Sequence, residues 1–562
     1  MHLPHKTAAL ALGFSVAMAF AAHADESDAS DRTRHVLLLS IDGMHSVDFQ
    51  NCIAANTCPN MAALAKNGVN YRRTSTSKPS DSFPGLMAIV TGGTPAVLGV
   101  WYDVAYDRVL APPASNTGNG LLAGACLTGQ ANGTRTEYEE GDDIDQTKIN
   151  GGGPYSTLDG GVLSIDPKKL VRDPFHNCDP VYPWNFIRTN TIFGVIHTAG
   201  GFTAWSDKHV VYAAVSGPTG TSSPSNLDDF YAPEVNSNLI PLPGVKTAAG
   251  LDCSIIPNNN GTDWTGDFDN IKCNDQLKVN AVRNWIQGND HLGGAKGKVP
   301  MIFGMNFQAV SVGQKLIESG VKGGYLDAAA TPSQPLLGEI KFVDGAVGQF
   351  VADLQGQHLL DSTTIIITAK HGQSPIDPNR FLPIPGHSGT NGSTPSSILG
   401  SSFLPNSELN QIGPTEDDVS LLWLKPGAST SAAVSLLESN ASSAGIGQIF
   451  EGTYLSTLYD KPGLPWDGAD PRTPDIIVAP HVGVIYTGSL KKQEEHGGFA
   501  QDDTNVMLLV SNPSIHETTV RSFVETSQVA PTVLKLLGLD PNRLDAVRKE
   551  GTAVLPGLHF DN

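Results

Sequence analysis

The chain has 562 residues, of which 40% are hydrophobic and 16% charged, so it can bury a large core and does not have the composition of a disordered protein. Its formal net charge of −20 repels nucleic acid and anionic membranes at long range, which argues against a nucleic-acid-binding surface. A small anionic substrate would therefore have to be captured locally, by a metal ion or a buried cation.

The N-terminus has the pattern of an export signal. Lys6 lies in a short polar start, an apolar stretch covers residues 8–22, and a small-x-small cleavage motif follows at 22–24. We therefore expect a signal peptide at residues 1–24, a flexible segment at 25–34, and an exported protein, periplasmic or secreted. No later apolar run approaches the roughly 20 residues of a membrane span, so no transmembrane segment is expected after cleavage.

Short apolar runs alternate with helical patterns along the rest of the chain. Strands are predicted within residues 35–43, 191–201, 299–307, 362–372, 475–480 and 505–512. Helices are predicted after the first of these runs, in "PNMAALAKNG", and after the third, in "GEIKFVDGAVGQFVADLQ". This order favours an α/β fold, a three-layer α/β/α sandwich with a mostly parallel sheet.

Two long stretches rich in Gly, Pro, Asn and Ser interrupt this pattern at about 111–189 and 217–274. Sheet-forming segments resume on both sides of each stretch, so we interpret them as loop-rich insertions within a single domain at 35–562.

Six cysteines, an even number, agree with an oxidising compartment. The sequence permits 15 pairings, and a preference for neighbours favours Cys52 with Cys58, Cys126 with Cys178, and Cys253 with Cys273.

Polar residues of chemical interest follow the predicted strands. Asp42 ends "LLLSIDG", and Lys370 and His371 end "IIITAKHG", where ligand sites form in α/β sheets. Ser82 in "DSFPG" is placed as an N-cap or beside one, where the positive end of a helix dipole favours an alkoxide. Each has a structural alternative, namely an Asp-Gly turn, a helix cap or a packed histidine. Together with His496 in "EEHGGF" they form a candidate site.

Other charged residues nearby are interpreted as structural. Alternation along a strand would place Asp207, Lys208 and His209 on opposite faces, so structural or rim roles are expected, although residues 205–209 could shape the substrate pocket. Lys78 and Asp81, beside Ser82, are expected at the surface.

The motifs "LLLSIDGM", "DSFPGLMAIVTGG", "IIITAKHG", "EEHGGF" and "TSQVAPTVLKLLGLDP" resemble the type I phosphodiesterase and nucleotide pyrophosphatase family of the alkaline phosphatase superfamily. The resemblance implies an alkaline phosphatase-like fold, two zinc ions and a covalent enzyme intermediate. It assigns Ser82 as nucleophile and as a ligand, and it assigns Asp42, His371 and His496 as further metal ligands.

The chain also departs from the family pattern. Lys370 stands where the family has an acidic ligand, Val310 and Gln314 replace an Asp and a His, and Gly85 replaces an Asn that helps to hold phosphate. Asn306 and Gln314 are possible substitute ligands or substrate contacts. An ammonium beside a divalent cation is repelled by several kcal/mol at an effective dielectric of about 20, so Lys370 and a neighbouring metal should exclude each other.

The sequence therefore predicts an exported phosphoesterase that acts on phosphodiesters, nucleotide pyrophosphates or phosphomonoesters through Ser82, with zinc or another divalent cation at fewer than two sites. Lys370 would stand in for a lost metal, with His371 as acid or base. The alternatives are a catalytically reduced anion-binding homologue and a hydrolase of another ester such as sulfate. Oligomeric state and substrate identity do not follow from the sequence.

Overall fold

The computed structural model describes residues 33–118, 120–138, 161–235, 244–254, 266–386, 393–406, 413–459, 461, 469–487 and 492–560. The expected signal peptide at 1–24 lies outside the described residues, as does most of the segment at 25–34. Among the described residues, no helix combines the length and apolarity needed to cross a membrane.

The main sheet is built around β1 (His35–Ile41), an apolar strand with both faces covered. Val36 and Leu38 point into one core, whereas Leu37 and Leu39 point into another, as the two-residue repeat of a strand requires. β1 pairs in parallel with strands on both sides. The strand order is β22 (Thr518–Val520), β2 (Gly68–Tyr71), β21 (Leu509–Ser511), β13 (Thr363–Thr368), β1, β10 (Ile302–Phe307), β8 (Ala204–Ser206) and β9 (Asp229–Tyr231).

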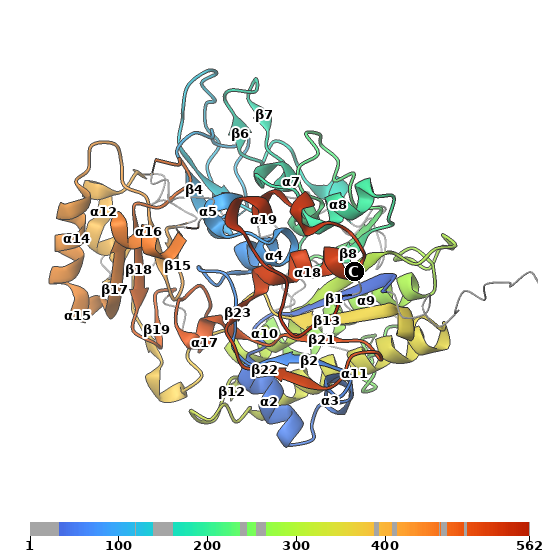
Figure 1. Ribbon diagram of the computed structural model, residues 1–562. Coiled ribbons are helices and arrows are strands. Elements are labelled where there is room, and N and C mark those ends of the chain that lie inside the picture. Colours follow the sequence, from blue (N-terminus) through green and yellow to red (C-terminus); the bar gives the residue numbers. More distant parts are fainter. Residues whose placement is uncertain are drawn as a thin grey trace, which may run out of the picture.

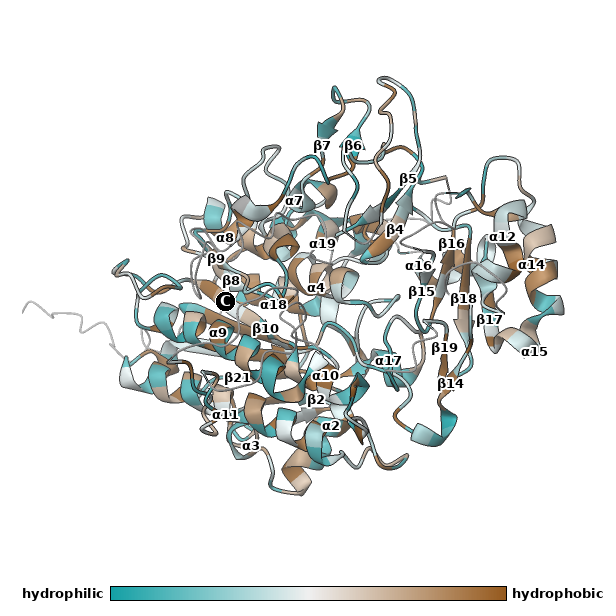
Figure 2. Ribbon diagram, turned by 180° about the vertical axis from the view of Figure 1, so that it is seen from behind, coloured by the Kyte–Doolittle hydropathy of each residue, from teal (hydrophilic) through white to brown (hydrophobic). Residues whose placement is uncertain are grey.

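Helices cover both faces of this sheet (Figures 1 and 2). One layer contains α4 (Ser82–Thr91), α7 (Pro183–Phe186), α8 (Ile192–Thr198), α18 (Val529–Leu536) and α19 (Asp545–Glu550). The other contains α2 (Ser46–Ala54), α3 (Pro59–Ala65), α9 (Phe268–Ile286), α10 (Ala309–Lys315) and α11 (Gln334–Gly356). All pairings in the sheet are parallel except those of β21, so the predicted three-layer α/β/α sandwich with a mostly parallel sheet is confirmed.

A smaller antiparallel sheet lies beside the main one (Figure 1). Its order is β15 (Thr415–Glu416), β16 (Ser420–Leu422), β18 (Ile476–Pro480) and β17 (Ile446–Glu451). One face packs against α12 (Pro395–Phe403) and α14 (Thr430–Ser439), and the other packs against Trp101 and Tyr102. Apart from Ser420, β16 and β18 are made of apolar residues, which pack into cores on both faces of the smaller sheet (Figure 2).

The remaining strands form short ribbons. They are β3 (Thr74–Ser75), β20 (Asn505–Val506) and β23 (Val524–Glu525); β4 (Val104–Asp107) and β5 (Thr134–Glu137); β6 (Arg172–Asp173) and β7 (Asp179–Pro180); β11 (Ile317–Glu318) and β12 (Val321–Lys322); and β14 (Leu382–Pro383) and β19 (Val484–Ile485). The remaining α-helices are α5 (Pro95–Leu98), α15 (Ala441–Ala444), α16 (Thr453–Tyr459) and α17 (Gln501–Thr504).

Three predicted strands differ from the structure. The strand predicted at 191–201 is wrong, because these residues form α8, whose N-cap Thr191 accepts a hydrogen bond from the Gly194 amide. Residues 475–480 do form a strand, but it belongs to the smaller sheet. The run at 505–512 splits into β20 and β21, and β21 runs antiparallel to β13.

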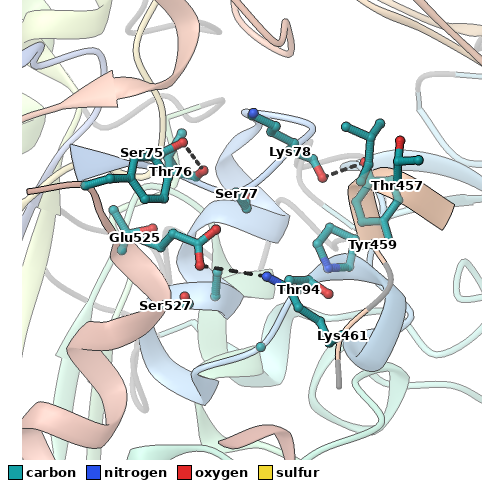
Figure 3. Close-up of a pocket in the computed structure, with 16 residues that line it drawn as sticks. Ser75, Thr76, Ser77, Lys78, Thr94, Thr457, Tyr459, Lys461, Glu525 and Ser527 are labelled. Atoms are coloured by element: carbon teal, nitrogen blue, oxygen red, sulfur yellow. Dashed lines mark hydrogen bonds and ion pairs between the residues drawn. The ribbon is translucent and has the colours of Figure 1, made fainter. Parts of the chain in front are cut away.

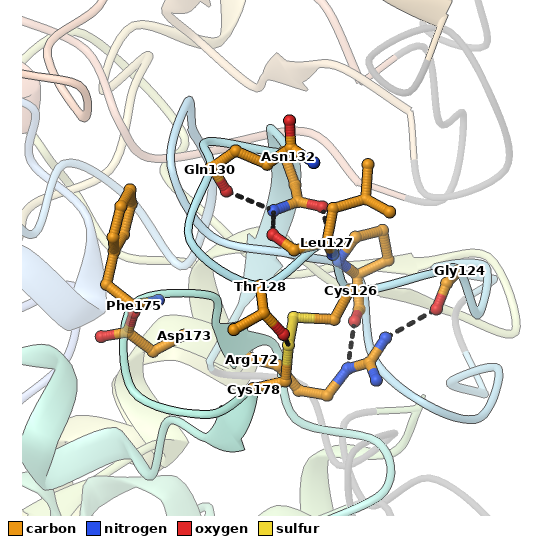
Figure 4. The surroundings of a disulfide bond; sticks show 11 residues. Gly124, Cys126, Leu127, Thr128, Gln130, Asn132, Arg172, Asp173, Phe175 and Cys178 are labelled. Atoms are coloured by element: carbon orange, nitrogen blue, oxygen red, sulfur yellow. Dashed lines mark hydrogen bonds between the residues drawn. A yellow bond between two sulfur atoms is a disulfide. The ribbon is translucent and has the colours of Figure 1, made fainter.

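The neighbour pairing of all six cysteines is confirmed by disulfides joining Cys52 to Cys58, Cys126 to Cys178, and Cys253 to Cys273. The second bridge joins two positions within the loop-rich stretch at about 111–189 (Figure 4). Beside it, the Arg172 guanidinium donates hydrogen bonds to the Pro112 and Gly124 carbonyls, so the stretch is also fixed by a side chain that binds its backbone.

Candidate active site

Four neighbouring strands of the main sheet deliver polar side chains to one place. Lys370 and His371 follow β13, and Asp42 follows its neighbour β1. Asn306 lies near the end of β10, and Asp207 and Lys208 follow β8. Parallel strands end at the same edge of a sheet, which is where α/β proteins form ligand sites. The site therefore draws on segments more than 300 residues apart in sequence.

Ser82 is brought to this edge by α4. Asp81 is the N-cap of the helix, and its side chain accepts a hydrogen bond of 3.1 Å from the Phe83 amide. Ser82 is consequently the first helical residue, as expected for a position beside the cap, where the helix dipole favours negative charge. Asp81 is buried, so the expectation of a surface carboxylate there is wrong.

Ser82 and His371 form a hydrogen-bonded pair. The Ser82 Oγ lies 3.0 Å from Nε2 of His371. The other ring nitrogen, Nδ1, lies 2.9 Å from the Gly372 carbonyl oxygen, which can only accept, so Nδ1 carries the proton of a neutral ring. Burial lowers the pKa of His371 to about 4, and the charges of Lys315 and Lys208 act in the same direction, while Asp42 opposes them. The neutral imidazole thus presents a lone pair to the serine hydroxyl.

Two lysines lie beside the serine and Asp42. Lys208 Nζ lies 3.1 Å from Ser82 Oγ and 3.7 Å from Asp42 Oδ2. Lys370 Nζ lies 3.8 Å from the same Asp42 oxygen, so this carboxylate faces two ammonium groups. Asn306 adds a hydrogen bond of 3.2 Å to Asp42 Oδ2.

Asp207 fixes Lys370 from the opposite side. It accepts a hydrogen bond of 3.0 Å from Lys370 Nζ, and its own carboxylate is held by the Lys208 amide at 2.8 Å and the Trp205 indole at 2.9 Å. Lys370 Nζ also lies 3.9 Å from the centre of the Tyr212 ring. Asp207 and Lys208 are therefore site residues, and the interpretation that strand alternation separates them is wrong, because β8 ends at Ser206 before either one.

Gln314, a possible substitute metal ligand in the sequence, forms hydrogen bonds within the protein instead. The Gln314 amide nitrogen donates to the Gly43 carbonyl and to the Tyr325 hydroxyl, both at 2.8 Å, and its oxygen accepts from Gln373. Gln314 is thus committed to a buried network that includes Gly43 and Tyr325, and its amide oxygen is already engaged.

His496 lies on the other side of His371, with ring centres 4.2 Å apart. Burial lowers the pKa of His496 well below its usual range, and the neighbouring His371 adds to this shift. His496 Nε2 lies 3.8 Å from Glu495, whose carboxylate is paired with Lys315 at 3.4 Å and Lys492 at 2.6 Å. His496 therefore lies next to His371, as the candidate site predicted from the sequence requires. The nearby carboxylate of Glu495 is paired with two lysines, as the carboxylate of Asp42 is.

A zinc ion does not fit beside Ser82. Zinc takes about four ligands from His, Cys, Asp or Glu, whereas Asp42 and Ser82 here each contact the ammonium of Lys208, and the acidic ligand position holds Lys370. Within the described ranges, no cluster of three or more His, Cys, Asp and Glu side chains is arranged to hold a metal ion.

Position 85 requires glycine because α4 lies close to the backbone of Lys370 there. A Cβ built at Gly85 would lie 2.2 Å from the Lys370 carbonyl oxygen, far inside van der Waals contact. The asparagine found here in the family pattern therefore cannot be accommodated, and this chain has no amide side chain at that position to hold a phosphate.

The centre of the site is closed to solvent. Ser82, Asp42, Lys370 and His371 are each 0% exposed, whereas Lys208 is 5% and His496 is 8% exposed. These two side chains mark the side from which a ligand could reach Ser82.

A separate cavity of about 220 Å³ lies along α4, away from Ser82 (Figure 3). Its wall includes Thr76 and Lys78 from the segment that precedes the helix, and Lys461 and Glu525 from later in the chain. Thr76 Oγ1 donates a hydrogen bond to the Lys370 carbonyl, which links this wall to the site.

Comparisons with known proteins bear on the family and the fold. A family model described as type I phosphodiesterase / nucleotide pyrophosphatase matches residues 36–123 and 275–503, more than half of the chain. A comparison with curated protein sequences found no match.

Among solved structures, murine ectonucleotide pyrophosphatase/phosphodiesterase 5, in an inactive form with AMP, shares 13% identity with a TM-score of 0.51. That alignment covers 90% of this chain and 96% of the murine chain. A second structure of the murine protein shares 14% identity with a TM-score of 0.50, and the alignment covers 90% of this chain and 96% of the murine chain. The human protein shares 11% identity with a TM-score of 0.50 over 90% and 95%. At these identities the structural likeness establishes the fold.

Proposed function

Because the chain belongs to the type I phosphodiesterase / nucleotide pyrophosphatase family, we propose that it hydrolyses phosphodiester, nucleotide pyrophosphate or phosphomonoester bonds through a covalent intermediate on Ser82. The observation that carries the proposal is the contact of 3.0 Å between Ser82 Oγ and the unprotonated Nε2 of His371. A serine at a helix N-terminus with an adjacent base is the arrangement of an activated nucleophile.

The reaction follows from this geometry in two displacements. In the first, the Ser82 proton moves to His371 Nε2, Oγ forms a bond to phosphorus, and the bond from phosphorus to the leaving oxygen breaks. The leaving oxygen keeps the electron pair and takes a proton from water. In the second, a water oxygen forms a bond to phosphorus and its proton passes to solvent, while the bond from phosphorus to Ser82 Oγ breaks and Oγ takes back the proton from His371.

Lys370 supplies positive charge beside the reacting centre. The ammonium lies 3.8 Å from Asp42 and is fully buried, so its charge is screened much less than a surface charge would be. It stands where the family pattern has an acidic metal ligand. We propose that this charge stabilises the anion that develops on Ser82 and on the phosphoryl group. No step of the proposed reaction passes through a metal ion, since the groups around Ser82 do not fit one.

The substrate is proposed to be a small anionic phosphate compound. The AMP in the structure of the murine relative supports a nucleotide-like molecule, and the net charge of −20 disfavours a polynucleotide. The three disulfides support an exported protein, periplasmic or secreted.

The proposal is tested with chromogenic esters. Purified mature protein is assayed on bis(4-nitrophenyl) phosphate, 4-nitrophenyl phosphate and 4-nitrophenyl sulfate, together with the Ser82→Ala and Ser77→Ala variants. Ser77 is a matched control because its hydroxyl bonds to the Pro79 carbonyl in the same segment, outside the site. We expect phosphate ester hydrolysis that falls at least about 1,000-fold in Ser82→Ala and is unchanged in Ser77→Ala.

Two outcomes would redirect the assignment. Hydrolysis of the sulfate ester alone would identify a sulfatase. Binding of phosphate without turnover of any ester would identify an anion-binding homologue, and turnover that survives in Ser82→Ala would exclude the covalent mechanism.

A further inference from the structure

Of the two lysines in the site, Lys208 is the one whose ammonium contacts the proposed nucleophile. It follows β8 by two residues, and its Nζ lies 3.1 Å from Ser82 Oγ, a normal hydrogen-bond distance. Lys370, in contrast, contacts Asp42, Asp207 and the Tyr212 ring. The two lysines therefore have different positions relative to the reaction.

The two ammonium groups are held by a fixed frame. Asp207 accepts from the Lys370 side chain and from the Lys208 backbone amide, so one carboxylate positions both lysines. Trp205 donates to the other Asp207 oxygen and prevents the carboxylate from rotating. Since Asp207, Lys370 and Trp205 are all 0% exposed, the charges are set before any ligand arrives.

We propose that Lys208 is a catalytic residue and that, with Lys370, it takes the place of a metal ion beside Ser82, so that the ester is cleaved without a bound metal. This inference deepens the proposed function and rests on it. Two ammonium groups carry the same charge as one divalent cation, and Asp42 and Asp207 balance that charge at a distance of 3.0 to 3.8 Å.

The role of Lys208 follows from its donors. An ammonium has three N–H groups, and one of those on Lys208 is directed at Ser82 Oγ. When the Ser82 proton passes to His371, the Lys208 N–H group stabilises the oxygen that attacks phosphorus. When the serine leaves in the second displacement, the same N–H group stabilises the departing oxygen.

An ion pair between Lys208 and Asp42 that served only stability would not require the contact between Lys208 and Ser82. Asp42 already has Lys370 at 3.8 Å and Asn306 at 3.2 Å, so its charge is compensated without Lys208. Lys208 is also 5% exposed, whereas Ser82, Asp42, Lys370 and His371 are each 0% exposed, so it lies on the side from which an anion would arrive.

The test uses the folded mature protein after exhaustive dialysis against a chelator, with metal content measured by mass spectrometry. Variants are Lys208→Met, Lys208→Arg and, as a control, Lys272→Met. Lys272 is also a partly buried lysine in ion pairs, with Asp269 at 2.8 Å and Glu339 at 3.7 Å, but it lies on α9 outside the site. Circular dichroism confirms folding, and Lys208→Gln replaces Lys208→Met if the latter does not fold.

We expect the metal-free wild type to keep its kcat on bis(4-nitrophenyl) phosphate. Lys208→Met should lower kcat by about 100- to 1,000-fold, which is the usual effect of removing one electrostatic donor. Lys208→Arg should recover part of this loss, and Lys272→Met should equal the wild type. Activity that disappears with the chelator and returns with zinc would overturn the inference while leaving the phosphoesterase assignment intact. Wild-type kcat in Lys208→Met and Lys208→Gln would also overturn it.

A second readout separates this inference from the proposed function. Covalent labelling of Ser82 by a fluorophosphonate, followed by peptide mass spectrometry, reports the reactivity of the serine without requiring turnover. If no ester is hydrolysed, the proposed function fails, and at least tenfold slower labelling of metal-free Lys208→Met would still support Lys208 as the group that activates Ser82. Equal labelling of wild type and Lys208→Met would refute that role.

Discussion

Replacing Lys370 by aspartate restores the acidic residue of the family pattern, yet Lys208 should still prevent zinc binding. An ion held by Ser82 would lie about 2 Å from its Oγ, and because Lys208 Nζ is 3.1 Å from that oxygen, the ion would lie within about 5 Å of the ammonium. At an effective dielectric of about 20, a divalent ion and an ammonium at about 5 Å repel by about 7 kcal/mol. This repulsion corresponds to about a 10⁵-fold loss of affinity.

The double variant Lys370→Asp/Lys208→Ala removes that repulsion. It leaves Asp42, His371 and the introduced carboxylate as three zinc ligands, which is the protein ligand number of catalytic zinc sites. We expect zinc bound per chain, measured by elemental mass spectrometry after dialysis, to rise toward one only in the double variant.

The matched control is Lys370→Asp/Lys272→Ala, which loses a lysine outside the site. Competition with a chromophoric chelator gives the dissociation constants of all three variants. If Lys370→Asp alone bound zinc as tightly as Lys370→Asp/Lys208→Ala, the electrostatic role assigned to Lys208 would be wrong.

Three further results are expected. Burial lowers the pKa of His371 to about 4, and the base acts in its neutral form. The value of kcat/KM should therefore stay level from about pH 8 to about pH 5 and fall about tenfold per pH unit below pH 4. A pH–rate profile that already falls below about pH 6.5 would contradict this. Gly85→Ala places a Cβ against the Lys370 carbonyl and should lower both kcat and the unfolding midpoint in urea, whereas a wild-type midpoint would show that the helix can shift. Replacing Cys126 and Cys178 by serine opens a bridge that spans 52 residues and should lower the free energy of unfolding by up to about 4 kcal/mol, measured by urea titration; an unchanged free energy would mean that the hydrogen bonds of the loop suffice.

The fold and part of the site were predictable because they depend on local patterns. Buried strands show as apolar runs, and a polar residue directly after such a run lies at the edge of the sheet, which placed Asp42 and His371 correctly. The helix that carries Ser82 was marked by its capping sequence. These signals are contained in a few adjacent residues each.

Lys208, which lies next to the proposed nucleophile Ser82, is interpreted from the sequence as structural because strand alternation is carried through Asp207, Lys208 and His209. The strand there is β8, which is only three residues long and ends at Ser206. With β8 ending at Ser206, the rule that identified Asp42 also points to Asp207 and Lys208. The signal is present in "AWSDKH", but so short a strand gives too little periodicity to show where it ends.

The role of Gln314 depends on contacts between distant segments. Its position in the sequence matches a metal ligand, but its amide is taken by the Gly43 carbonyl, the Tyr325 hydroxyl and Gln373. Which of several polar partners a buried amide chooses is decided by tertiary packing, and no local pattern contains that information.

The most direct test of the central claim is to trap the intermediate on Ser82 in metal-free protein. Chelator-treated wild type is mixed with bis(4-nitrophenyl) phosphate, quenched with acid during the first turnovers, digested and examined by peptide mass spectrometry, with zinc quantified in the same sample. The account predicts a 4-nitrophenyl phosphoryl adduct on Ser82, in which one of the two ester groups is retained, with far less than one zinc ion per chain. An adduct that forms only when zinc is restored, or one that forms on another residue, would contradict it.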